Sequence, residues 1–276
     1  MLILIYTILL GIFLQVKSFA FFEYPEYKIE PLPSRVNKIY LQDSLRYLAL
    51  TSDAENVIES AFSVDSQIQY KLLTFPDNAV RVLMVYDSRK NTQSINIINL
   101  KHGQFLYDSL KFFKQRIVKN EFINIPITRY HNEVYNNIRQ EIINNIIQGS
   151  IIQINTLGIT SAYGTMLAIE LTQLQNPIQS ILQFGATRFT TQSVHNYIQG
   201  KFKNIMLNIT HEMDINHQLS MNSSIATSLE EYIICVSKMC HETIYEQKTF
   251  SKNAILTHIS AFPHQYAEMY HDSLIQ

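Results

Sequence analysis

Two adjacent hydroxyl side chains, Thr160 and Ser161, lie within a seven-residue run, 158–164 (GITSAYG), that separates two apolar stretches. The stretch before the run, residues 151–154, has the β-branched character of a buried strand, and the stretch after it, residues 166–171, is typical of a helix. A hydroxyl on a strand-to-helix turn acts as a nucleophile when a histidine takes its proton and a carboxylate orients that histidine. The spacing therefore makes Thr160 or Ser161 a candidate nucleophile for ester chemistry.

The elements that would position these hydroxyls alternate between helix and strand along the chain. Helical spacing predicts two helices within residues 36–66, where Ser52 and Asp53 are available to cap the second one. Further helices are predicted at residues 132–148, 164–175 and 193–198, and strands at residues 80–86, 151–154, 178–184 and 204–209. This alternation predicts a mostly parallel sheet covered by helices, in a single domain over residues 21–276.

Three segments of the chain resemble the class 3, or fungal-type, lipases. Residues 184–188 (FGATR) are similar to the family's F-G-x-P-R, and residues 208–219 (NITHEMDINHQL) to its V-T-H-x-x-D-x-V-P-x-L-P. Residues 256–262 (LTHISAF) are similar to the D-H-x-x-Y region that supplies the family's histidine. The resemblance spans residues 80–262 and implies an α/β-hydrolase fold, with a mostly parallel central sheet flanked by helices, and hydrolysis of acylglycerols or related esters.

The same resemblance implies catalytic roles, because α/β-hydrolases place the nucleophile, the acid and the histidine in that order along the chain. The matching residues are Thr160 or Ser161, then Asp214, then His258, with His264 and His271 as nearby alternatives for the base. Asp214 is the best matched of these, since it follows a predicted strand and lies in a turn. The arrangement corresponds to a serine-hydrolase triad.

The nucleophile turn departs from the G-x-S-x-G pattern, which needs small residues two positions before and after the nucleophile. Around Ser161 those positions hold Ile159 and Tyr163. Around Thr160 they hold Gly158 and Ala162, but the threonine methyl group stiffens the side chain and crowds the turn. Neither hydroxyl fits the pattern well.

The expected oxyanion hole departs from the family as well. It would be formed by Ala162, the residue after Ser161, and by Ser88, in the turn after the strand at residues 80–86. That turn lacks the family's glycine, and residues 92–100 keep the closing Asn-Leu of a family segment without its tryptophan. We therefore expect a lipase-like protein with weak or lost activity; the alternative is a non-catalytic lipase-like protein that binds lipid or a protein partner.

The first residues of the chain predict entry into the secretory pathway. Residues 2–14 form an apolar run too short to favour a spanning helix, and Ala20 suits cleavage of a signal peptide over residues 1–20. An uncleaved anchor, with the domain acting as an interaction module at a membrane surface, is the alternative. Secretion would make the protein extracellular or lumenal.

A secretory route gives a few further residues a meaning. It permits Cys235 and Cys240, the 2 cysteines of the chain, to form a disulfide. Asn208 and Asn222 match the glycosylation triplet. No metal site or cofactor is expected, because the cysteines have one adjacent histidine and no further ligands nearby. With Lys+Arg 22 against Asp+Glu 23 and no basic block, nucleic acid is not an expected partner.

Overall fold

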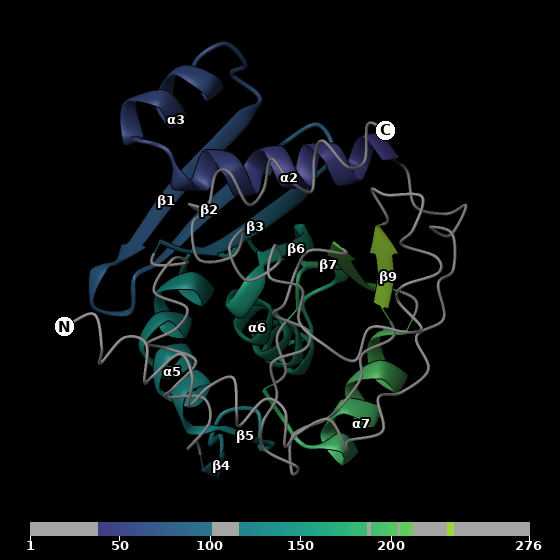
Figure 1. The fold of residues 1–276 in the computed structure, drawn as a ribbon. Coiled ribbons are helices and arrows are strands. Elements are labelled where there is room, and N and C mark those ends of the chain that lie inside the picture. The colour runs from purple at the N-terminus through teal and green to yellow at the C-terminus, as the bar shows by residue number, and fades with distance from the viewer. Residues whose placement is uncertain (1–37, 101–115, 187–188, 204, 212–230, 235–276) are drawn as a thin grey trace, which may run out of the picture.

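The computed structural model describes residues 38–100, 116–186, 189–203, 205–211 and 231–234 of the 276-residue chain (Figure 1). The helices are α2 (Lys38–Ser52), α3 (Glu55–Phe62), α5 (Arg129–Asn144), α6 (Ser161–Gln173) and α7 (Gln192–Phe202), with short 3-10 turns η1 (Pro76–Asn78) and η3 (Gly158–Thr160). The strands are β1 (Ile68–Phe75), β2 (Val80–Asp87), β3 (Thr92–Asn99), β4 (Ile117–Lys119), β5 (Pro126–Thr128), β6 (Ile151–Leu157), β7 (Ile178–Phe184), β8 (Met206–His211) and β9 (Glu231–Ile234).

A seven-stranded sheet in the order β1-β2-β3-β6-β7-β8-β9 forms the centre of the molecule. The β1–β2 and β2–β3 pairs are antiparallel, and every pair from β3 onward is parallel. β4 and β5 make a separate two-stranded antiparallel pair. Because the parallel strands share one direction, their carboxyl ends meet at one edge of the sheet, which is where such folds place their sites.

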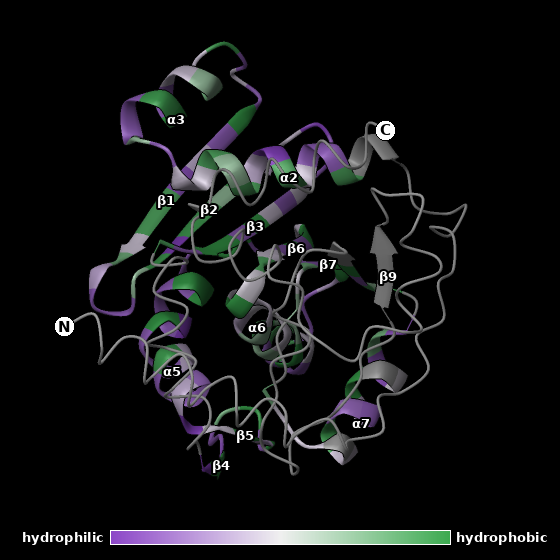
Figure 2. Cartoon of the chain, viewed as in Figure 1, coloured by the Kyte–Doolittle hydropathy of each residue, from purple (hydrophilic) through white to green (hydrophobic). Residues whose placement is uncertain are grey.

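Helices cover both faces of this sheet. α5, α6 and α7 share one apolar core with alternate residues of β2, β3, β6 and β7, while α2 and α3 lie against the opposite face. α6 is buried on all sides from Ser161 to Leu171, as expected for a helix enclosed between a sheet and other elements. In Figure 2, hydrophobic and hydrophilic residues alternate along α5, which turns a single stripe to the core.

The structure confirms the predicted mostly parallel sheet flanked by helices. The predicted strand at residues 178–184 is β7, and the strand at 80–86 is β2 with one residue added. The predicted cap of the second helix is wrong, because α3 begins after Ala54 and has no side-chain cap. Among the strands that were not predicted, β1 and β3 complete the antiparallel part of the central sheet. None of the helices in the described segments is long and apolar enough to cross a membrane.

Candidate active site at the β6–α6 turn

The chain passes from β6 to α6 through one 3-10 turn whose first residue is Gly158. Gly158 has a φ of 63°, in the left-handed region that residues with a side chain rarely adopt. In α/β-hydrolases the nucleophile is the residue on the strained turn between strand and helix, where its side chain is exposed above the sheet. The residue that occupies this conformation here is a glycine.

Thr160, two residues further on, uses its hydroxyl to hold the turn together. Its Oγ1 lies 2.7 Å from the carbonyl oxygen of Ile97 and 3.0 Å from that of Leu157, either of which accepts its proton. The same oxygen accepts a hydrogen bond from the Leu157 amide at 3.2 Å. The side chain is fully buried. Thr160 is therefore bound to backbone groups inside the fold.

Ser161 is the first residue of α6 and has helical dihedral angles, with φ −56° and ψ −35°. It is 1% exposed, and its carbonyl oxygen accepts hydrogen bonds from Gln183 Nε2 and Thr165 Oγ1, both at 2.9 Å. Ala162 follows it in the same helical turn and is fully buried. The predicted nucleophile and its neighbour thus belong to the helix and not to the strained turn.

Gly164 sets how closely α6 approaches β6. A Cβ atom added to Gly164 would lie 2.4 Å from Thr156 Cγ2 and 3.2 Å from Ile154 Cγ2, closer than side chains pack. The absence of a side chain therefore lets the helix rest directly on the strand. This contact fixes the direction in which α6 leaves the turn.

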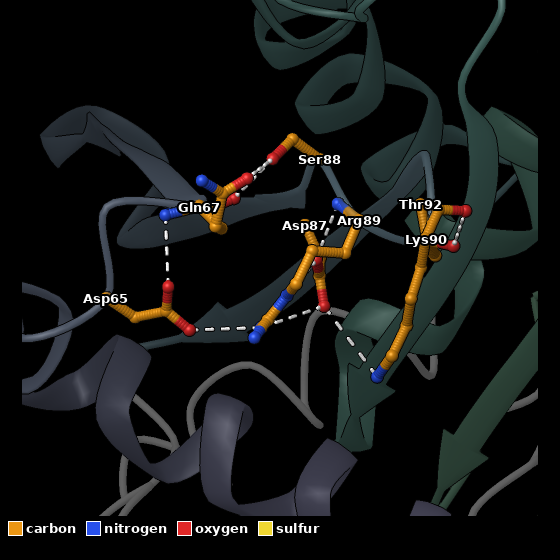
Figure 3. Close-up of polar contacts among 7 residues, drawn as sticks. All are labelled: Asp65, Gln67, Asp87, Ser88, Arg89, Lys90 and Thr92. Atoms are coloured by element: carbon orange, nitrogen blue, oxygen red, sulfur yellow. Dashed lines mark hydrogen bonds and ion pairs between the residues drawn. The ribbon is translucent and has the colours of Figure 1, made fainter.

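Ser88 lies at the opposite edge of the sheet. The β2–β3 register pairs Asp87 with Thr92, and Thr92 in turn pairs with Ile151, the first residue of β6. A strand rises about 3.3 Å per residue, so the length of β6 puts about 20 Å between this turn and residue 158. The Ser88 hydroxyl contacts the Gln67 carbonyl oxygen and Oε1 at 3.0 and 2.9 Å, beside ion pairs of Arg89 with Asp65 and Asp87 (Figure 3). The structure does not bring Ser88 to the candidate nucleophiles, which rules out the oxyanion role expected from the sequence.

The strand that does reach the candidate site is β3, which was not predicted from the sequence. Ile97 pairs with Thr156 of β6 and contacts Thr160, so the carboxyl end of β3 adjoins the turn. The Leu100 amide beyond it donates to the Ala79 carbonyl oxygen at 2.7 Å. The missed signal was the short polar turn at residues 88–91, which reads as a hairpin between two strands. Because β2 and β3 form a hairpin, it is the end of β3, and not the end of β2, that lies at the carboxyl ends of the parallel strands.

Several predicted residues lie outside the described segments: Asp214, His258, His264, His271, Asn222, Cys235, Cys240 and residues 1–20. Their roles remain predictions. Asn208, in contrast, lies within β8 and is 4% exposed, so the folded chain offers no space for a glycan on it. Within the residues that the structure places, no cluster of three or more His, Cys, Asp or Glu side chains could hold a metal ion.

A buried ionic cluster between α5 and α6 was also not predicted. Glu170 accepts a hydrogen bond from Tyr135 Oη at 2.6 Å and from Arg139 Nε at 2.9 Å, and it forms a second contact with Arg139 Nη2. Burial, and then the neighbouring Glu170 carboxylate, raise the pKa of Tyr135. The hydrogen bonds to Glu170 raise the pKa of Arg139. The cluster keeps its charges paired and joins the two helices.

His131, in the first turn of α5, is fully buried near the start of α6. Its Nδ1 lies 2.5 Å from Thr128 Oγ1, and its ring is within 6.0 Å of the rings of Tyr130, Tyr163 and Phe189. Loss of hydration lowers the pKa of His131 to about 3, so the ring is neutral at ordinary pH. Its position among aromatic rings indicates a packing role at the junction of α5 and α6.

Known proteins with a similar structure were found, whereas known proteins with a similar sequence were not. No protein-family model and no curated protein matches the sequence. The structure is similar to Lip2 lipase from Yarrowia lipolytica (TM-score 0.61, 11% identity), over 77% of this chain and 83% of the lipase. It is similar to the triacylglyceride lipase of Rhizomucor miehei (TM-score 0.60, 13% identity), over 84% and 97% of the two chains.

A third similar structure is a triacylglycerol lipase described as having a serine protease triad as its catalytic centre (TM-score 0.61, 13% identity; 82% of this chain and 96% of that one). Identities of this size establish a shared fold and no more. The chain therefore has an α/β-hydrolase-like fold of the kind seen in fungal lipases, as predicted from the sequence.

Proposed function

We propose that this protein is a lipase-like protein that binds a lipid or ester ligand without hydrolysing it. The observation that carries the proposal is the identity of the residue at the β6–α6 turn. Gly158 has the left-handed conformation of a nucleophile elbow and no side chain to act from it. The ligand class comes from the fold, because the similar structures are lipases.

The two nearby hydroxyls do not substitute for the missing one. Thr160 Oγ1 is within hydrogen-bonding distance of the Ile97 carbonyl oxygen, and the backbone of Ser161 is helical. A nucleophile must approach the ester carbonyl carbon at about 3–3.5 Å. Both residues are buried, and the Thr160 hydroxyl is bound to backbone groups of the turn and of β3.

The test is reaction of the purified protein with a fluorophosphonate probe, alongside turnover of p-nitrophenyl butyrate. We expect no labelling and no turnover above that of heat-denatured protein. Labelling of the wild-type protein that is lost in Ser161→Ala or in Thr160→Val would overturn the proposal, and would favour an active serine or threonine hydrolase with Asp214 and His258 completing the triad.

Ligand binding is measured separately, by co-sedimentation of the protein with a trioleoylglycerol emulsion and with phosphatidylcholine vesicles. We expect retention on at least one of these surfaces, and a protein that remains in the supernatant with both would contradict the lipid part of the proposal. Bovine serum albumin is unsuitable as a negative control because it binds fatty acids, so ovalbumin serves instead.

We also propose that the protein is secreted after removal of residues 1–20. The support is the apolar run at residues 2–14 followed by the small residue Ala20. Mass spectrometry of the mature N-terminus tests this directly. A first residue at position 21 supports secretion, and an intact Met1 in membrane fractions supports an anchored protein.

A further inference from the structure

We propose that two copies of this chain associate edge to edge through β1, which pairs antiparallel with β1 of the second copy about a twofold axis at Leu72. The two central sheets then continue as one sheet. This surface is separated from β6 by β2 and β3, and the inference does not depend on the proposed function.

β1 is the first strand of the seven-stranded sheet, at the end away from β9. Among the residues that the structure describes, β2 alone pairs with it, and Figure 1 shows no described element beyond its outer edge. The β1–β2 register continues without a bulge over the 8 residues of β1, which include no proline. A long, regular edge strand presents a row of open amide and carbonyl groups to which another strand can add.

Two hydrogen bonds determine which backbone groups face that edge. The Ser88 amide donates to the Gln67 carbonyl oxygen at 3.0 Å. Because hydrogen-bonded and non-hydrogen-bonded pairs alternate in an antiparallel ladder, this bond turns the backbone groups of the odd-numbered residues of β1 towards β2. The Leu100 amide donates to the Ala79 carbonyl oxygen at 2.7 Å. That bond agrees with the first, because it assigns the odd-numbered residues of β2 to β3 and leaves the even-numbered ones for β1.

The even-numbered residues of β1 therefore point their amide and carbonyl groups outward. The Ile68 amide already donates to the Asp65 carbonyl oxygen at 3.0 Å. Within the described part of the chain, both groups remain open at Tyr70, Leu72 and Thr74, a set that is symmetric about Leu72. A second copy in the same register pairs Tyr70 with its Thr74 and Leu72 with its Leu72, which supplies about six main-chain hydrogen bonds. The open edge is thus complementary to itself.

Charge and hydrogen-bonding capacity favour this register over its two neighbours. A pairing centred on Lys71 would set the two lysines directly opposite each other, with Cα atoms about 4.5 Å apart, where like charges are destabilising. A pairing centred on Leu73 would set Tyr70 opposite Pro76, which has no amide to donate. Centred on Leu72, the pairing sets each Lys71, the one charged residue of β1, opposite Leu73 of the second copy. The net charge of the chain is −1, so overall repulsion between two copies is weak.

Thr74→Pro tests the interface. The Thr74 amide points outward and its side chain is exposed, so proline removes no hydrogen bond to β2, and Thr74→Val is a matched control that keeps the amide and the branched shape. In sedimentation equilibrium of the full chain over a dilution series, we expect wild type and Thr74→Val to approach twice the mass of one chain. Thr74→Pro should raise the dissociation constant by roughly tenfold or more. A wild-type protein that stays monomeric, or a dimer that Thr74→Pro leaves unchanged, overturns the inference.

Cysteine cross-linking tests the register and does not require the proline variant to fold. In the register centred on Leu72, the Cα atoms of the two copies of residue 72 lie about 5.5 Å apart, within the range of a disulfide, and those of residue 69 lie about 20 Å apart. Above the wild-type background from Cys235 and Cys240, we expect a disulfide-linked dimer for Leu72→Cys and none for Gln69→Cys. Equal yields for the two variants overturn the inference.

Hydrogen exchange distinguishes a second copy from any other occupant of the edge. The amides of Tyr70, Leu72 and Thr74 should become protected as the protein concentration rises, whereas those of Lys71 and Leu73, which face β2, should be protected throughout. Protection of the outward amides that does not change with concentration would mean that another segment of the same chain covers the edge, and it would overturn the inference.

Discussion

Thr160 and Ile97, 63 residues apart in the chain, are joined by a hydrogen bond of 2.7 Å from the threonine hydroxyl to the isoleucine carbonyl oxygen. The bond connects the turn after β6 to the neighbouring strand β3. The same hydroxyl oxygen accepts a hydrogen bond from the Leu157 amide. One side chain therefore joins the end of β3, the end of β6 and the turn that follows β6. A residue that the sequence offers as a nucleophile is thus a structural link.

Replacement of Thr160 by valine tests this link. Valine has the same shape and leaves the Leu157 amide and the Ile97 carbonyl oxygen without their partner. We expect the free energy of unfolding to fall by about 1–3 kcal/mol, and by less than about 1 kcal/mol for Thr160→Ser, which keeps the hydroxyl. Urea unfolding measures both variants. Equal values for valine and serine would show that the hydroxyl bonds do not stabilise the turn.

Gly164→Ala tests the contact between α6 and β6. The added methyl group would overlap Thr156 Cγ2, and overpacking of this kind costs about 1–3 kcal/mol, which urea unfolding measures. Gly200→Ala in α7 is the control, since a Cβ there meets open space and alanine favours a helix by about 1 kcal/mol over glycine.

The double variant Gly164→Ala with Thr156→Ser should recover part of this loss. Serine lacks the Cγ2 atom that causes the overlap and keeps the hydroxyl, which lies 3.4 Å from the Leu182 carbonyl oxygen. If the losses of the two single variants simply add in the double variant, the overlap with Thr156 is not the cause.

The regular elements of this fold were predictable where the pattern is local. β7 has a bounded apolar run, and α5 has apolar residues at helical spacing, so each element was predicted from its own residues. β3 was not, because Ser94 and Asn96 lie in its buried interior. Their side chains are satisfied by Asn155 of β6, whose Nδ2 lies 3.1 and 2.8 Å from them. A strand with these polar residues can lie in the core only because β6 supplies hydrogen-bond partners for them, and those partners are not visible in the sequence of β3 itself.

The position of the strand-to-helix turn was predictable from the sequence, and the backbone conformation of its individual residues was not. The sequence of residues 158–164 indicated a strand-to-helix turn, and the structure has one there. Two features of the turn are not visible in its sequence. One is the positive φ angle of Gly158, and the other is the carbonyl oxygen of Ile97 that accepts the Thr160 hydroxyl proton. The acceptor Ile97 belongs to β3, so the hydrogen bond that holds Thr160 in the turn depends on a strand that was not predicted from the sequence.

The Glu170–Arg139 pair should contribute strongly to stability. Arg139→Met would leave the carboxylate of Glu170 buried without its cation, and breaking a buried pair from one side costs about 3–5 kcal/mol. The matched control is Arg129→Met in the same helix, where the pair with Glu133 is exposed and is expected to contribute about 0.3–0.5 kcal/mol. Similar losses in thermal unfolding for the two variants would contradict the assignment.

His131 should make the protein less stable in mild acid. The folded protein holds the His131 pKa at about 3, below the ordinary value of 6.5, so the unfolded chain binds a proton in this pH window that the folded chain does not. The contribution of His131 to the free energy of unfolding is therefore fully present above pH 6.5 and is lost as the pH falls towards 3. Over this range the free energy of unfolding changes by at most about 1.4 kcal/mol per pH unit on account of this residue. His131→Asn keeps an acceptor for Thr128 and removes the titration. Its free energy of unfolding, measured in urea from about pH 7 to about pH 4, should depend less steeply on pH, and parallel curves for the two proteins would show that His131 does not titrate with the predicted shift.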